Sequence, residues 1–116
     1  MASDSSNARL LLVEDDLDNR DLTRELLECA GHTVVAAASG AEALACAQRE
    51  KFQLVITDVG LPDVNGVELA RQLRAIQPQI GVVLLSGYSI PSSTLPGAEM
   101  LEKPVEPETL ERVVQK

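Results

Sequence analysis

The sequence predicts one α/β domain built on an open, doubly wound sheet of five parallel strands. Short apolar runs recur along the chain, with helical patterns between most of them. The first four runs are aliphatic almost without alternation, as in strands that helices cover on both faces. Because parallel strands need a crossover connection, this succession of strand and helix favours a parallel sheet.

The predicted strands are short and poor in aromatic residues. They cover residues 10–13, 34–38, 54–56, 82–85 and a weaker run at 100–101. The chain has one Tyr, one Phe and no Trp among 116 residues, although 45% of it is hydrophobic. Its core therefore has to be built from Leu, Val, Ile and Ala, which suits buried strands and the helices that cover them.

The first helix is predicted between the first two strands. Asp18 is expected to cap its start, and Gly31 to take the left-handed position past its end. The apolar residues at helical spacing in it are Leu22, Leu26, Cys29 and Ala30. Cys29 in this helix and Cys46 in the next form neither a CxxC pair nor a metal spacing, so we expect small, reduced core residues.

Capping signals predict two further helices and a last one. The sequences SGAE at 39–42 and NGVE at 65–68 have the spacing of a capping box. Pro78 ends the second of these helices, and Pro107 opens the last one. Residues 86–98 contain two prolines, two glycines and four serines without a helical stripe, so we expect the fourth helix to be short or missing.

Size and charge restrict the function classes. A chain of 116 residues fits one domain, predicted over residues 9–116 after a flexible polar tail at 1–8. The net charge of −8 and the lack of a basic stripe argue against direct binding to nucleic acid. No apolar run is long enough to cross a bilayer and no basic leader is present, so we expect a cytoplasmic protein with no membrane contact.

Polar residues follow the predicted strands at their carboxyl ends. In an open parallel sheet these ends form the crevice where ligands bind. The residues at this edge are Glu14, Asp15, Asp16, Asp58, Ser86 and Lys103. If the first and third strands are neighbours, roughly 5 Å apart, their carboxylates repel one another and call for a hard divalent cation. Mg²⁺ is expected, because it takes few carboxylates together with waters and a phosphate oxygen.

These side chains match the parts of a phosphoryl-transfer site. Asp58 supplies a nucleophile, Asp15 holds the metal ion, and Lys103 and Ser86 supply positive charge and a hydroxyl for the phosphoryl oxygens. Taken singly, Asp58 is more often a turn or cap residue and Lys103 ordinarily a surface lysine, while Ser86 is equally a turn hydroxyl; it is their combination that favours the site. His32, the single histidine, is expected to face solvent or cap a helix, so the phosphoryl group has to come from another protein.

The motifs LLVEDD, LVITDVGLPDVNG, VVLLSGY and LEKP together resemble the receiver domain of two-component response regulators over nearly all of residues 9–116. The resemblance implies a flavodoxin-like strand order of 2-1-3-4-5. It implies that Asp58 is the phosphoacceptor and that Asp15 binds Mg²⁺ directly, with Glu14 helping through water. It further implies that the Gly60 carbonyl completes the metal site, that Ser86 holds the phosphoryl group and that Lys103 pairs with it.

The resemblance also implies the phosphoryl donor, but it leaves the output protein and the extent of the whole protein open. The donor is a histidine kinase or a histidine phosphotransfer protein, and the domain promotes only its own phosphorylation and dephosphorylation. The output protein, and whether the chain is complete or part of a hybrid histidine kinase or longer regulator, stay open. Met100 stands where the family often has an aromatic residue. We therefore expect phosphorylation to act through Ser86 on the segment at 87–98.

Three alternative functions compete with this interpretation. An Asp-nucleophile phosphatase needs a second acid two residues after the nucleophile, where this chain has Gly60. A flavin-binding protein of similar topology needs a phosphate cradle after the first strand, where this chain has acids. A receiver-like scaffold that is no longer phosphorylated is disfavoured because every expected side chain is present.

Overall fold

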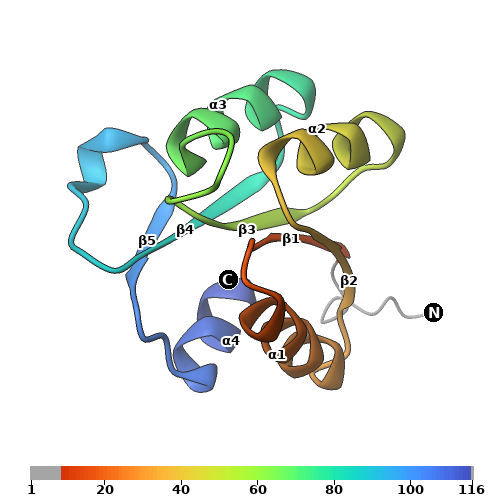
Figure 1. Cartoon of the computed structure of the whole chain (residues 1–116), viewed down its shortest axis with the longest axis vertical. Helices are drawn as coiled ribbons and strands as arrows, with labels where there is room; N and C mark the ends of the chain where they lie inside the picture. The colour runs from red at the N-terminus through yellow and green to blue at the C-terminus, as the bar shows by residue number, and fades with distance from the viewer. Residues whose placement is uncertain (1–8, 116) are drawn as a thin grey trace.

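The computed structural model describes residues 9–115 and contains a five-stranded parallel sheet in the order β2-β1-β3-β4-β5 (Figure 1). The strands are β1 (Arg9–Val13), β2 (Thr33–Ala37), β3 (Leu54–Asp58), β4 (Gly81–Ser86) and β5 (Glu99–Glu102). The helices are α1 (Leu17–Cys29), α2 (Gly40–Arg49), α3 (Gly66–Ile76) and α4 (Pro107–Gln115). The predicted doubly wound fold and strand order are confirmed, while the predicted tail at 1–8 lies outside the described residues.

Helices cover both faces of the sheet, as the aliphatic strands predict. Figure 1 shows α2 and α3 on one face and α1 with α4 on the other. Alternate residues of β1 therefore enter two separate cores, with Leu11 and Val13 on the α2/α3 side and Leu10 and Leu12 on the α1/α4 side. The edge strand β2 is only half-buried, so the helices cover both faces fully only at the central strands.

Strands β3 and β4 extend further than their apolar runs. Asp58 and Ser86 are the last residues of their strands, because the ladder pairs Asp58 with Leu85 and continues through the Val59 N–H to the Leu85 carbonyl at 2.9 Å. Backbone pairing does not depend on side-chain polarity, so a pattern of apolar residues ends before the strand does.

The starts of the helices follow the capping signals, with one correction. The Ser39 hydroxyl accepts from the Glu42 N–H at 3.2 Å and the Asn65 side chain from the Val67 N–H at 2.8 Å. At α1 the cap is Asp16, which accepts from the Asn19 N–H, so the assignment to Asp18 was wrong. Asp18 lies in the first turn instead, where its charge favours the helix dipole.

The buried face of α1 is not the predicted one. Leu22 and Leu26 are 57% and 39% exposed, and Cys29 and Ala30 are also exposed, whereas Leu27 is buried. The face toward the sheet carries Leu27 together with half-buried polar residues one and two turns earlier, so hydrophobicity alone does not reveal it. The prediction of a core role is therefore wrong for Cys29, whereas Cys46 is buried in α2 as expected.

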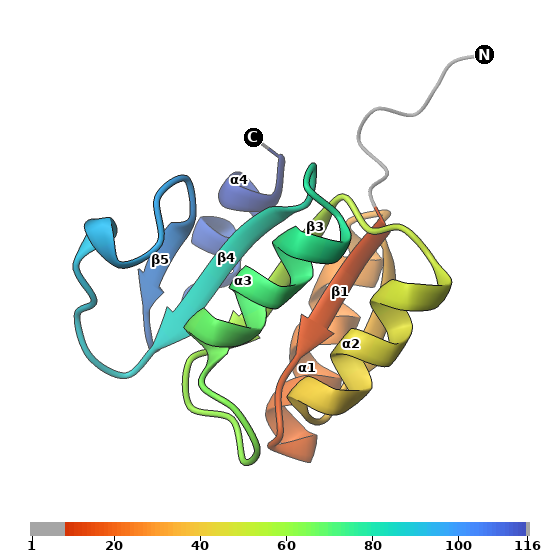
Figure 2. The same cartoon turned by 90° about the horizontal axis from the view of Figure 1, so that it is seen from above.

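The connection from β4 to β5 contains no α-helix. It forms a single 3-10 turn, η1 (Ser92–Thr94), at the edge of the sheet, where Figure 2 shows it passing outside β5. Leu95, only 3% exposed, fastens this connection to the core on the α2/α3 side. The expected loss of the helix between the fourth and fifth strands is confirmed, and α4 is the helix that follows β5. Among the described residues, no helix has both the length and the apolar character needed to cross a membrane.

Candidate functional site

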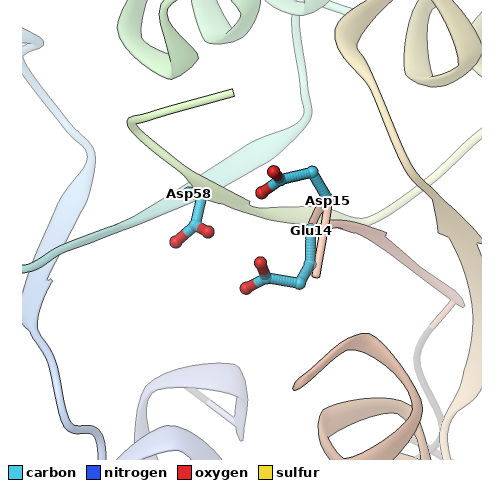
Figure 3. A group of neighbouring side chains, drawn as sticks. All are labelled: Glu14, Asp15 and Asp58. Atoms are coloured by element: carbon cyan, nitrogen blue, oxygen red, sulfur yellow. The ribbon is translucent and has the colours of Figure 1, made fainter. Parts of the chain in front are cut away.

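Three carboxylates meet where β1 and β3 end (Figure 3). Glu14 and Asp15 directly follow β1, and Asp58 closes β3, whose Thr57 pairs with Val13 of β1. One carboxylate oxygen from each of the three acids lies within 4.8 Å of the others. Glu14 and Asp58 are buried and Asp15 is exposed, so the cluster is open to solvent on the Asp15 side.

Lys103 joins this cluster from the turn after β5. Its ammonium nitrogen lies 2.5 Å from Asp58 Oδ1 and 3.7 Å from Glu14 Oε1. The Lys103 N–H donates to the Ser86 carbonyl at 2.7 Å, which fixes the start of the turn against the end of β4. Burial lowers the pKa of Lys103, but the carboxylates of Asp58, Glu14 and Asp15 outweigh that effect and raise it. The lysine is therefore charged under all ordinary conditions.

Glu14 is the acid most altered by the site. Burial raises its pKa from 4.5 to about 7, with the nearby Asp58 carboxylate acting in the same direction. The Asp16 N–H, which donates to Glu14 Oε2 at 3.1 Å, and the charge of Lys103 act against this rise. One lysine thus does not neutralise the cluster, and without a further cation the site tends to keep a proton near neutral pH.

The oxygen atoms present suit a hard divalent cation. The three acids offer carboxylate oxygens alone, with no sulfur or imidazole among the clustered groups. Apart from its ion pair with Lys103, Asp58 Oδ1 makes no hydrogen bond within residues 9–115. A buried carboxylate oxygen in that state is able to accept a further ligand.

Ser86 lies at the same edge, on the strand beside that of Asp58. It is buried, and it directly follows Leu85, the register partner of Asp58. Its hydroxyl accepts from the Tyr88 N–H at 3.1 Å, so in this state the hydroxyl supports the first turn of the segment after β4. The sheet places Ser86 beside the acids and Lys103, with its hydroxyl bound to its own loop.

The loop after β3 carries Gly60 past the cluster. Gly60 is exposed and forms an isolated bridge with Asn65, while the Gly66 N–H donates to the Val59 carbonyl at 2.7 Å. A Cβ on Gly66 would lie 2.1 Å from the Asp58 carbonyl oxygen, so only glycine fits where the loop returns beneath the acid.

Two residues were not predicted in the roles that they have: Arg20 beside the acids, and His32, which precedes β2 and so lies at the opposite edge of the parallel sheet. Arg20 donates from Nη1 to the Glu14 carbonyl at 3.0 Å and so supports the acidic turn from α1. His32 is 5% exposed, with Nε2 3.4 Å from Glu111 Oε2 of α4, so the expectation of a solvent-facing histidine was wrong. Nothing local reveals this burial, because the histidine and its partner are 79 positions apart.

A groove runs from the acids between α1 and α4. Its volume is about 590 Å³, and the exposed Leu22 and Leu26 of α1 form part of one wall. Glu14 and Lys103 line its end at the carboxylate cluster, and Leu110 of α4 lines the other wall. The apolar residues that the sequence assigned to the core thus border an open surface beside the site.

Comparison with known proteins gives one consistent family. The family model described as "Response regulator receiver domain" matches residues 10–115. The response regulator receiver protein CpdR of Brucella abortus is 38% identical over 101 residues, which cover 83% of this chain and 84% of that protein. The chain spans only 25% of two other curated relatives, so larger proteins also contain such a domain.

Solved structures agree in fold. The chemotaxis protein CheY4 of Vibrio cholerae superposes with a TM-score of 0.86 at 31% identity, covering 93% of this chain and 96% of that one. The response regulator TrrA of Thermotoga maritima, described in complex with Mg²⁺ and BeF, gives a TM-score of 0.82 at 28% identity, with 93% and 96% covered. The fold, the ordered motifs and the matching family model together make this chain a member of the response regulator receiver domain family, whose function is phosphoacceptance in two-component signalling.

Proposed function

We propose that the chain accepts a phosphoryl group on Asp58 in a Mg²⁺-dependent reaction and transmits the change to another protein. The supporting observation is the convergence of Asp15, Asp58 and Lys103, from three separate segments, at one edge of the sheet. The donor we propose is a phosphohistidine of a histidine kinase or phosphotransfer protein. Residues 9–116 would act as one cytoplasmic receiver domain, alone or within a longer protein.

Each side chain has a distinct task in the proposed reaction. A carboxylate oxygen of Asp58 attacks phosphorus, the P–N bond to the donor imidazole breaks, and its electron pair leaves with the nitrogen. The Lys103 ammonium, already 2.5 Å from Asp58, would then pair with a phosphoryl oxygen. Ser86 would turn its hydroxyl from the Tyr88 N–H toward another phosphoryl oxygen.

The proposed Mg²⁺ site uses Asp15 and Asp58 as direct ligands. Glu14 would act through water and Gly60 through its backbone carbonyl. When bound, the ion would offset the negative charge of the acids and of the incoming phosphoryl group. Support comes from the clustered carboxylate oxygens and from the exposure of Asp15, which leaves room for retained waters.

Turnover of small phosphate esters is not part of the proposal. A phosphatase that uses an aspartyl nucleophile needs an acid two residues later to protonate the leaving group. Gly60 occupies that position, and it has no side chain to donate a proton. We propose that catalysis by this chain is limited to making and breaking its own acylphosphate.

The proposed reaction predicts an absolute metal requirement. With acetyl phosphate and millimolar Mg²⁺, the intact mass should rise by one phosphate, because the cation offsets three converging carboxylates. With EDTA in place of Mg²⁺, the mass should stay unchanged. Phosphate incorporation at full rate in the chelator would contradict the proposed metal site.

The change on phosphorylation is predicted in the segment after β4. If the Ser86 hydroxyl leaves the Tyr88 N–H, the first turn of this helix-free segment loses a supporting hydrogen bond. Amide exchange measured by mass spectrometry should then change across residues 86–103 and stay constant in β1 and β3. Unchanged exchange across 86–103 would count against this route from the site to an output protein.

A further inference from the structure

The tip of the loop after β3 is fastened to the start of another helix. Asp63 accepts from two backbone N–H groups of α2, with Oδ1 2.9 Å from the Gly40 nitrogen and Oδ2 3.0 Å from the Ala41 nitrogen. These bonds lower the pKa of the Asp63 carboxyl, so it stays ionised as an acceptor. They join positions 22 and 23 residues apart, which no local turn requires.

The loop also packs directly against α2 at this point. A Cβ on Gly40 would lie 2.3 Å from Val64 Cγ1, so the loop occupies the space that a side chain would need. The sequence predicted the capping box that opens α2 but gave no sign of the partner from the loop. Two hydrogen bonds from backbone N–H groups of α2 to the Asp63 carboxylate, together with the close approach of Val64 to Gly40, therefore hold the loop against α2.

This contact matters for the site because the same short loop begins at Gly60. The Gly60–Asn65 bridge joins the two ends of the loop to each other, and the Gly66 N–H donates to the carbonyl of Val59, which directly follows β3. The tip of the loop is held by Asp63. Pro62, between Gly60 and Asp63, has its own φ fixed by the proline ring. The loop is thus fixed at its base and at its tip, with Gly60 at the base, two residues after Asp58.

We propose that Asp63 is a positioning residue for the metal ion. By fastening the loop of residues 60–65 to α2, it holds the Gly60 carbonyl where the ion is bound, so less order has to be gained on binding. The inference rests on the proposed Mg²⁺ site and deepens it. Asp63 itself is not a ligand in this scheme, because both of its oxygens are engaged by α2.

Ser39 provides a matched control in the same helix. Its hydroxyl caps α2 by accepting from the Glu42 N–H at 3.2 Å, and its side-chain bond stays within the capping turn, apart from the β3–α3 loop. Ser39→Ala and Asp63→Ala each remove a cap from α2, and each should lower its stability by a comparable amount. Only Asp63→Ala also releases the loop that carries Gly60.

The test is Mg²⁺ binding by titration calorimetry on the full chain and on Asp63→Ala, Asp63→Asn and Ser39→Ala. Asp63→Ala should raise the Mg²⁺ dissociation constant about five-fold, because the released loop then has to be ordered when the ion binds, at a cost of about one residue's backbone freedom. Asp63→Asn keeps one acceptor oxygen but loses the charge, so its Mg²⁺ dissociation constant should lie between those of the unchanged chain and Asp63→Ala. Ser39→Ala should bind as the unchanged chain does.

A kinetic measurement separates positioning from chemistry. With acetyl phosphate as donor, Asp63→Ala should need more Mg²⁺ for half-maximal phosphorylation, while the rate at saturating Mg²⁺ stays close to that of the unchanged chain. Circular dichroism checks that each variant is folded. If Asp63→Ala does not fold, Asp63→Asn takes its place in both measurements.

The outcomes are distinct. If Ser39→Ala weakens Mg²⁺ binding as much as Asp63→Ala, the effect is general loss of stability and the inference is wrong. If neither Asp63 variant changes the dissociation constant, it is wrong as well. If the unchanged chain binds no Mg²⁺, the metal site of the proposed function fails, and this inference falls with it.

Discussion

Asp58→Asn should abolish the metal-dependent gain of one phosphate when the chain is exposed to acetyl phosphate and Mg²⁺. The amide is nearly the same size as the carboxylate but offers no anionic oxygen to attack phosphorus. Asp58 is also the acid that Lys103 approaches most closely, at 2.5 Å against 3.7 Å for Glu14. Intact-mass spectrometry with and without Mg²⁺ measures the effect directly.

The control for this loss is Asp18→Asn. Asp18 is an exposed acid in the first turn of α1, outside the carboxylate cluster, and its variant should be phosphorylated like the unchanged chain. Glu14 is the other acid paired with Lys103, so it is the natural candidate for a wrong acceptor. Full phosphate incorporation in Asp58→Asn, mapped to Glu14 by peptide fragmentation, would overturn the assignment of the nucleophile.

Lys103→Met should destabilise the metal-free protein, because it leaves two buried carboxylates without their cation. Removing one partner of a fully buried ion pair costs several kcal/mol, but the Lys103 side chain is 35% exposed and its pairs are partly screened. We therefore expect a loss of about 1–2 kcal/mol near pH 8. Urea unfolding in EDTA measures it, and millimolar Mg²⁺ should reduce the difference.

The effect of Lys103→Met should depend on pH through Glu14. The pKa of this carboxyl rises from 4.5 to about 7 in the folded chain, so its contribution to stability is full below about pH 4.5 and is lost as the pH rises through about 7. The charge of Lys103 lowers the pKa of Glu14, so in Lys103→Met this carboxyl keeps its proton to a higher pH. The loss of stability with rising pH then continues further in the variant. The variant should thus be less destabilised near pH 6, where Glu14 keeps its proton, than near pH 8.

An exposed lysine distant from the acids provides the comparison. Lys51 precedes β3, at the opposite end of the strand from Asp58, and Lys51→Met should leave stability unchanged within error at both pH values. Equal losses for the two variants, or a loss for Lys103→Met that is the same at pH 6 and pH 8, would show that the ion pairs with Asp58 and Glu14 do not carry the effect.

The sequence was sufficient for the sheet and for the edge that carries the site. Aliphatic runs mark strands that are buried on both faces, and the carboxyl ends of such strands meet by geometry alone. The sequence alone therefore predicts that Asp15, Asp58 and Lys103 meet at one edge of the sheet. Lys103, an ordinary lysine by composition, stood out only because it follows the last strand.

Features that depend on distant partners were not predictable in the same way. The burial of His32 depends on Glu111 of α4, and the fastening of Asp63 depends on the start of α2. At α1, the polar residues on the buried side concealed which face packs against the sheet, and Leu22 was assigned to the core although it borders the groove. In each case the deciding contact joins elements whose spacing in sequence carries no signal.

The single 3-10 turn between β4 and β5 has a consequence for how this domain can diverge. A helix in that position would commit a whole apolar stripe to the sheet, whereas here Leu95 is the one fully buried hydrophobic side chain described between residues 87 and 98. Substitutions at the exposed positions of this stretch should cost little folding energy. Natural variation can therefore reshape the surface next to Ser86 and Lys103 while the reactive groups at its two ends stay in place.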